Sequence, residues 1–134
     1  MGAIVFGLPE RLAADLAREL GITVAVETGT FGGGSTRTLA SIVERVISIE
    51  LSQDLHDAAL RTLADLPNVT LLHGSSSDVL PGVVSDLHDP AIYWLDGHWC
   101  EGASAGYGSL CPVLDFSGVS GMGDTGLEAG TGIV

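Results

Sequence analysis

A glycine-rich segment, VETGTFGGGST at residues 26–36, is the first part of the chain that indicates chemistry. Its glycines at positions 29 and 32–34 let the backbone approach a ligand with no Cβ in the way. A helix predicted to begin near Ser35 would add unpaired N–H groups and the positive end of its dipole. Glu27, just before the loop, would repel a polyphosphate but receive an ammonium or hydroxyl group. The segment therefore indicates a nucleoside that carries an amine.

A second acidic residue, Glu50, stands 50 − 29 = 21 positions after Gly29. It lies at the end of the apolar run RVISIEL, residues 45–51. An acidic residue about 20 positions past the first glycine, at the tip of the second strand, can accept hydrogen bonds from both ribose hydroxyls. A solvated carboxylate at a strand end is the alternative, and the glycine loop favours the ribose role.

The elements that would position these residues alternate along the chain. Apolar, β-branched runs predict buried strands at 22–27, 45–51, 69–73 and 91–96. Periodic segments predict helices at 9–20, 35–43 and 77–87, and a further helix with Ser52 as its N-cap. This alternation predicts an α/β, Rossmann-like, doubly wound parallel sheet, with any ligand at the carboxyl ends of its strands.

With these motifs in place, the chain resembles a class I S-adenosylmethionine-dependent methyltransferase. The glycine segment resembles the first motif of that family, and SIEL (48–51) resembles the acidic end of its second strand. HGSSSDVLP (73–81) resembles the loop after strand three, and YWLDGHW (93–99) resembles strand four with its following loop. The resemblance covers about residues 8–115 and implies the strand order 3-2-1-4.

The resemblance also implies a set of residues around S-adenosylmethionine. Those expected to border its methionine portion are Glu27, Gly29, Thr30 and Gly32. Glu50 would hold the ribose, with Leu51 near the adenine and Ser75 and Ser76 near the adenine edge. The family often has an acidic residue where this chain has Ser75, so Ser76 or Asp78 is the alternative contact for the adenine amine.

Asp96 and His98 are the candidates for catalysis. Methyl transfer sometimes needs a base to deprotonate the acceptor, and an imidazole titrates in the right range. Resembling O-methyltransferases use an Asp after strand four for a divalent metal, so Asp96 with His98 could instead contribute to a metal site. Glu101 and Asp115 are the acidic residues nearby that could add ligands. A third reading has Asp96 closing the cofactor site and His98 capping a turn.

Composition narrows the range of partners. The chain has 134 residues and a net charge of −12, with 17 acidic residues against five arginines and no lysine. Nucleic-acid binding is not expected, because phosphate contacts need Lys and Arg. No apolar run reaches the roughly 18 residues of a membrane helix, and the expected location is cytoplasmic. The expected partner is a small-molecule methyl acceptor, with the hydroxyl of a sugar or other metabolite favoured.

Two other nucleotide-binding patterns fit less well. A phosphate loop would have a lysine where this chain has Ser35, and without that cation the pattern loses its main electrostatic attraction. A dinucleotide-binding oxidoreductase with bound NAD would have a glycine where this chain has Phe31. Both remain alternatives to the methyltransferase reading.

The composition changes near residue 115. Residues 1–115 are expected to form the cofactor-binding domain, and the Gly-rich residues 116–134 a disordered tail. Methyltransferases of this kind continue past strand four, so the change suggests a truncated or frameshifted reading frame, and a cofactor-binding fragment without turnover is an alternative function. Strand four would then be an exposed sheet edge that favours self-association.

Overall fold

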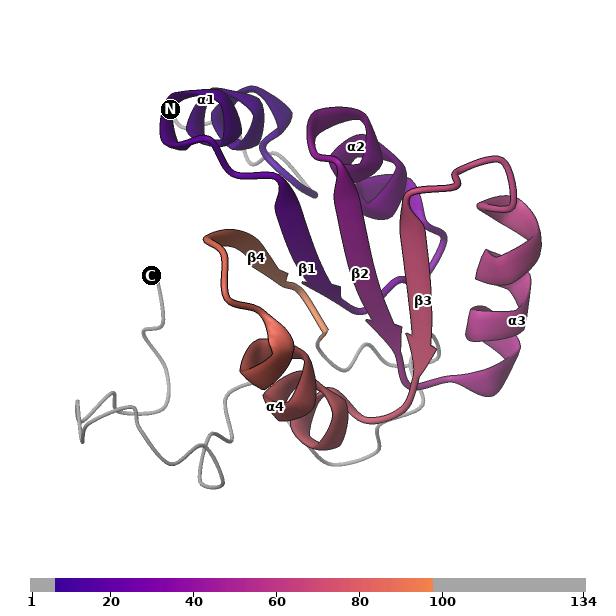
Figure 1. The fold of residues 1–134 in the computed structure, drawn as a ribbon. Helices are drawn as coiled ribbons and strands as arrows, with labels where there is room; N and C mark the ends of the chain where they lie inside the picture. Colours follow the sequence, from indigo (N-terminus) through magenta and orange to yellow (C-terminus); the bar gives the residue numbers. More distant parts are fainter. Residues whose placement is uncertain (1–6, 98–134) are drawn as a thin grey trace, which may run out of the picture.

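The computed structural model describes residues 7–97, which form a four-stranded parallel sheet with helices on both faces (Figure 1). The strands are β1 (Val24–Thr28), β2 (Arg45–Glu50), β3 (Val69–His73) and β4 (Ala91–Leu95). Their order across the sheet is β3-β2-β1-β4, and every pairing is parallel. The fold class and strand order predicted from the sequence are thereby confirmed.

Four helices connect or precede these strands: α1 (Glu10–Leu20), α2 (Gly34–Ile42), α3 (Gln53–Thr62) and α4 (Ser76–Asp86). Two of them have the ends that the sequence favours. Gly21 ends α1 in a left-handed conformation, with φ of 63°. Ser52 caps α3 as predicted, since its side chain accepts a hydrogen bond from the N–H of Leu55.

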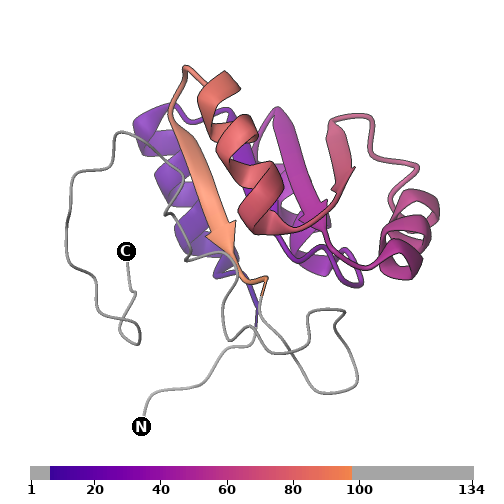
Figure 2. The same ribbon diagram turned by 90° about the horizontal axis from the view of Figure 1, so that it is seen from below.

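The two faces of the sheet are covered differently (Figure 2). On one face, α1 and α2 pack against β1 and β2 through a cluster of Ala17, Ala25, Leu39, Val43 and Val46. On the other face, Leu80 of α4 packs against Val26 and Ile49. Helix α3 lies beside β3, at the far side of the sheet from β4 (Figure 1). Because side chains alternate across a strand, this arrangement buries β1 and β2 on both faces.

The element boundaries differ from the sequence-based ones by two residues or fewer at each strand end. Strand β1 begins at Val24 rather than Ile22 and runs one residue beyond Glu27. Strand β4 ends at Leu95, so Asp96 already belongs to the loop. His98, the domain boundary near 115 and the tail 116–134 lie outside the described residues. Among residues 7–97 there is no helix with the length and hydropathy to cross a bilayer.

Candidate functional site

The glycine loop between β1 and α2 packs closely on one side and is open on the other. Gly29 has φ of +81°, and a Cβ there would lie 2.9 Å from the Cα of Gly97. Only a glycine allows this close approach of two backbones at the carboxyl ends of β1 and β4. At Gly32 and Gly34, by contrast, a Cβ would meet no atom of residues 7–97 within 4 Å. The described part of the chain therefore leaves the outer side of the loop open to a ligand.

The amino end of α2 faces the same loop. Its N-cap is Gly33, with φ of +77°, and no side chain caps the helix. A serine or threonine at that position would have satisfied one of the first N–H groups of the helix. The first turn of α2 contains no acidic residue. Uncapped N–H groups and the positive end of the dipole favour an anionic group, such as a ligand carboxylate, at this point.

The Glu50 carboxylate lies at the carboxyl end of β2, and the backbone of two loops holds it. Its Oε2 accepts a hydrogen bond from the N–H of Phe31, at 2.9 Å, and its Oε1 accepts one from the N–H of Ser52, also at 2.9 Å. The residue is 6% exposed. Each carboxylate oxygen keeps a second lone pair, so the group can accept two further hydrogen bonds in a fixed orientation.

Glu27 is buried beneath the loop and bound inside the protein. Its Oε2 accepts hydrogen bonds from the hydroxyls of Thr36 and Ser48, the latter at 2.6 Å, and the Ser48 hydroxyl lies 2.6 Å from that of Thr30. Burial raises the pKa of Glu27, the two hydroxyl donors lower it, and the negative charges of Asp96 and Glu50 raise it further. The side chains of Glu27 and Thr30 therefore anchor the loop from within.

Asp96 and Gly97 follow β4 and are held against β1. The N–H of Gly97 donates a hydrogen bond to the hydroxyl of Thr28, at 3.1 Å, across a sequence separation of 69 residues. The Asp96 side chain is exposed, and it is close enough to Glu27 to raise the pKa of that residue. The structure thus brings Asp96 to the same end of the sheet as Glu27 and Glu50.

For the predicted metal, the described residues offer Asp96 but no complete ligand set. Within residues 7–97 there is no group of three or more His, Cys, Asp or Glu side chains that could hold a metal ion. His98, Glu101 and Asp115 lie outside that range.

The residues predicted near adenine lie along the next two loops. Leu51 directly follows Glu50 and is 37% exposed. Ser75 is the N-cap position of α4, but its hydroxyl lies 2.7 Å from that of Ser77 and does not cap the helix. Ser76 is buried, at 8% exposed. Leu51 is therefore exposed to a ligand, whereas Ser75 is half-buried and Ser76 is buried.

Several contributors to the site were missed by reasoning from sequence. They are Thr28, Thr36, Ser48, Gly97 and the backbone N–H groups of Phe31 and Ser52. Ser48 had a detectable signal, because it is the one polar residue inside the apolar run VISI and pairs in register with Glu27. The backbone donors Phe31 and Ser52 had no such signal in the sequence, because every residue type except proline carries a backbone N–H.

Comparison with known proteins agrees with the fold. No protein-family model matches the chain, and no curated protein sequence matches it significantly. Solved structures do match. The O-methyltransferase TomG from Streptomyces achromogenes, involved in tomaymycin synthesis and solved with SAM, is 30% identical, with a TM-score of 0.50, over 61% of this chain and 39% of that one.

Two further structures match over similar shares. A protein from Staphylococcus aureus, provisionally assigned as a caffeoyl-CoA O-methyltransferase, is 27% identical, with a TM-score of 0.52, over 63% of this chain and 42% of that one. The O-methyltransferase from Bacillus cereus, solved with SAH, shares the fold at 24% identity and a TM-score of 0.54, over 69% of this chain and 46% of that one.

The fold is the one that these S-adenosylmethionine-dependent O-methyltransferase structures share, and the resemblance to class I methyltransferases inferred from the sequence is confirmed at the level of the fold. The chain spans 39% and 42% of the length of the first two matched structures.

Proposed function

We propose that this chain binds S-adenosylmethionine at the carboxyl ends of β1 and β2 and serves methyl transfer to a hydroxyl of a small molecule, such as a sugar or another metabolite. The observation that carries the proposal is the Glu50 carboxylate, held by the N–H groups of Phe31 and Ser52 beside an open glycine loop. A carboxylate with two fixed oxygens, each with a lone pair to spare, matches the paired hydroxyls of a ribose.

The rest of the loop fits the other parts of the cofactor. The uncapped amino end of α2 suits the carboxylate of the methionine portion. The backbone at Gly29 and the open face of Gly32 would border that portion. Leu51 offers an exposed apolar side chain next to Glu50, where the adenine would pack, and Ser75 and Ser76 begin the neighbouring helix. The residues present therefore fit S-adenosylmethionine.

S-adenosylmethionine supplies, when bound, a methyl group made electrophilic by a positively charged sulfur. The acceptor hydroxyl would lose its proton to a nearby base, for which Asp96 and His98 are our candidates. Two observations support Asp96 as this base. Its side chain is exposed, and the hydrogen bond from Gly97 to Thr28 keeps the adjoining backbone at the carboxyl end of β1. Asp96 is also the candidate for a divalent-metal ligand.

Calorimetric titration of the full chain with S-adenosylhomocysteine, NAD and ATP, side by side, tests the assignment. We expect heat of binding with the first compound only. Tighter binding of NAD would favour the oxidoreductase alternative, and the absence of binding to S-adenosylhomocysteine by folded protein would reject the proposal. Binding without formation of S-adenosylhomocysteine from S-adenosylmethionine across a panel of hydroxylated acceptors would favour the alternative of a cofactor-binding fragment.

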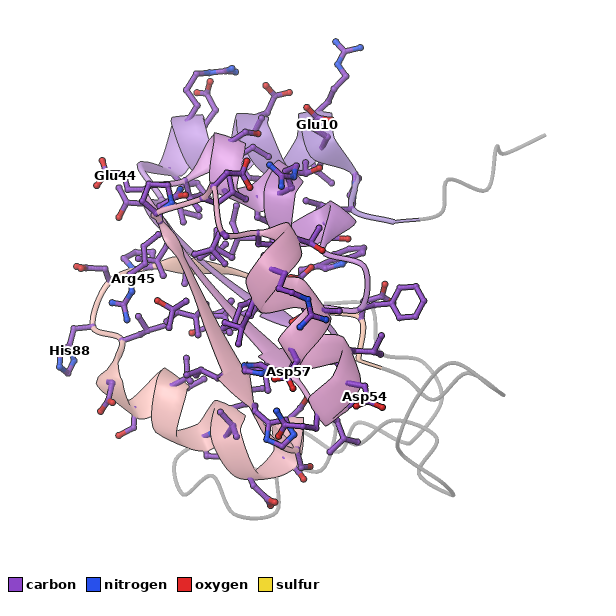
Figure 3. The ribbon with its side chains drawn as sticks, turned by 90° about the vertical axis from the view of Figure 1, so that its right-hand side faces the viewer. Glu10, Glu44, Arg45, Asp54, Asp57 and His88 are labelled. Atoms are coloured by element: carbon purple, nitrogen blue, oxygen red, sulfur yellow. The ribbon has the colours of Figure 1, made fainter. Side chains whose placement is uncertain are left out.

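The contribution of Glu50 has a matched control. Glu50→Ala should weaken binding of S-adenosylhomocysteine by about 1–3 kcal/mol, because the ribose hydroxyls lose their acceptor. Glu44→Ala makes the same change at an exposed residue where β2 begins. Figure 3 shows Glu44 with Arg45 and His88 on that side of the sheet, away from Asp54 at the start of α3. Affinity should be unchanged in Glu44→Ala, and equal losses in both variants would remove Glu50 from the site.

A further inference from the structure

Phe31 has a backbone conformation that its residue type disfavours. Its φ is +47°, and among residues 7–97 it is the one residue other than glycine with a positive φ. It occupies the second position of a turn that the N–H of Gly33 closes on the carbonyl of Thr30, at 2.8 Å. Turns with positive φ at that position favour Gly, Asn and Asp, whereas a bulky side chain there is uncommon.

Packing of the ring does not explain this conformation, because the Phe31 residue is 59% exposed. The turn instead makes a backbone contact with the second loop. With the chain leaving Phe31 in this direction, its N–H donates a hydrogen bond to Oε2 of Glu50, at 2.9 Å, across 19 positions of sequence. Strained backbone that persists in a structure is held by its surroundings, and such strain gathers at functional sites.

The contact links the two loops that form the site. Phe31 belongs to the loop after β1, whereas Glu50 ends β2 and is itself bound by the N–H of Ser52. With one donor on each oxygen, the Glu50 carboxylate can rotate in neither direction without breaking a hydrogen bond. A change in the turn at Phe31 would release Oε2 while leaving Oε1 in place.

We propose that Phe31 is a positioning residue for Glu50: the positive-φ turn aims its N–H at Oε2 and sets the orientation in which the carboxylate receives the two ribose hydroxyls. The inference rests on the proposed function and adds to it a residue whose backbone, rather than its side chain, determines affinity. The inference also implies that Phe31 affects binding of the ribose and of no other part of the ligand.

The experiment compares substitutions that all remove the exposed ring but differ in their tolerance of positive φ. Phe31→Asn and Phe31→Gly tolerate the conformation, and Phe31→Val, which is close to Asn in size but β-branched, does not. We expect the Asn and Gly variants to bind S-adenosylhomocysteine with similar affinity and the Val variant to bind roughly five- to tenfold more weakly. Phe31→Ala should fall between them, and it serves as the test if the Val variant does not fold.

Two controls separate positioning of Glu50 from a general effect on the loop. In a Glu50→Ala background, the difference between Phe31→Val and Phe31→Asn should disappear, because the carboxylate that transmits it is gone. Adenosine, which has both ribose hydroxyls, should show the same difference between the two variants as S-adenosylhomocysteine does. With 2′,3′-dideoxyadenosine the difference should disappear, because that compound has no ribose hydroxyls to be received.

Each result decides between the two proposals. Equal affinity of the Val and Asn variants, in a protein that binds S-adenosylhomocysteine, overturns the role of Phe31 and leaves the proposed function standing. A difference that persists in Glu50→Ala, or with the dideoxy compound, also overturns it, since the effect would then not pass through Glu50 to the ribose. No binding by the unmodified chain overturns both proposals.

Discussion

The two central strands, β1 and β2, and strand β4 all carry candidate site residues at their carboxyl ends, but the strands differ in burial. All five residues of β1 are buried, as are five of the six residues of β2, whereas β4 has no buried residue. Despite this burial, the central strands and the glycine loop carry many polar side chains, which are Glu27, Thr28, Thr30, Ser48 and Glu50. The part of the site with the most polar side chains, formed by β1, β2 and the glycine loop, is thus also the most buried part.

The difference shows how polar groups come to be fixed in a small α/β domain. A buried carboxylate is costly unless donors surround it. Among residues 7–97, only β1 and β2 have neighbouring strands on both sides that can supply such donors. Glu27 receives hydroxyls from α2 and β2, and Glu50 receives N–H groups from two loops. Asp96 follows a strand that, among residues 7–97, pairs only with β1, and its side chain is exposed.

The largest expected effect tests whether stability resides in the central strands. Leu39→Ala removes a side chain that is 0% exposed between α2 and the strands, and it should lower the free energy of unfolding by about 2–5 kcal/mol. Leu95→Ala makes the same change on β4, at a residue that is 38% exposed, and should cost about 1 kcal/mol or less. Urea denaturation followed by circular dichroism measures both. Equal losses would mean that β4 contributes as much to the core as the centre does.

A second comparison makes the same substitution at the two buried glutamates. Glu50→Gln replaces one acceptor oxygen with an NH2 group, which then faces the N–H of either Phe31 or Ser52. Each of these N–H groups is partly buried, and losing the acceptor of one should cost about 1 kcal/mol of stability. Glu27→Gln should cost less than Glu50→Gln, because both hydroxyls donate to Oε2 and one amide oxygen can accept from both. Urea denaturation at neutral pH checks the order, and the reverse order would show that these hydrogen bonds do not govern the stability of the two variants.

The pH dependence of the free energy of unfolding should reveal the contribution of Glu27. Its pKa is raised above the ordinary glutamate value of 4.5, chiefly by burial, so the folded protein holds this proton more tightly than the unfolded chain does. The associated stability is fully present below pH 4.5 and is lost as the pH rises through the higher folded-state value. Glu27→Gln cannot titrate, so its stability relative to the unmodified chain should increase over that pH range. Denaturation at a series of pH values measures this, and parallel curves for the two proteins would contradict it.

The sequence predicted the fold well because the fold depends on patterns that repeat. Apolar runs such as RVISIEL and the helical spacing between them fix where strands and helices lie, and Val69–His73 was predicted to the residue. The parallel order 3-2-1-4 came from the family resemblance and is confirmed. The glycine loop and Glu50 were also placed together correctly, since both follow strand ends that meet at one side of a parallel sheet.

What the sequence could not predict is which way each side chain points and what it binds. Thr30 and Glu27 were both expected to border the ligand, and their side chains are bound to Ser48 inside the protein. That arrangement depends on the register that sets Glu27 beside Ser48, which a sequence pattern does not specify. The contact between Phe31 and Glu50 depends on one backbone angle, which residue type argues against.

The smallest expected effect concerns association through β4. Tyr93 and Leu95 are 41% and 38% exposed, and among residues 7–97 strand β4 pairs only with β1. A strand edge with no neighbour offers backbone groups to a second copy. We expect light scattering to detect self-association at concentrations on the order of tens of micromolar.

Tyr93→Lys should reduce that association, because a charged side chain on an edge strand opposes pairing with another copy. Leu12→Lys is the control, since Leu12 is 56% exposed on α1 and so places the same charge on an exposed apolar site outside the sheet. A stable monomer in the unmodified chain would contradict exposure of the edge. A loss of association only in Leu12→Lys would instead place the contact on α1, where Leu16 and Leu20 continue the exposed apolar row.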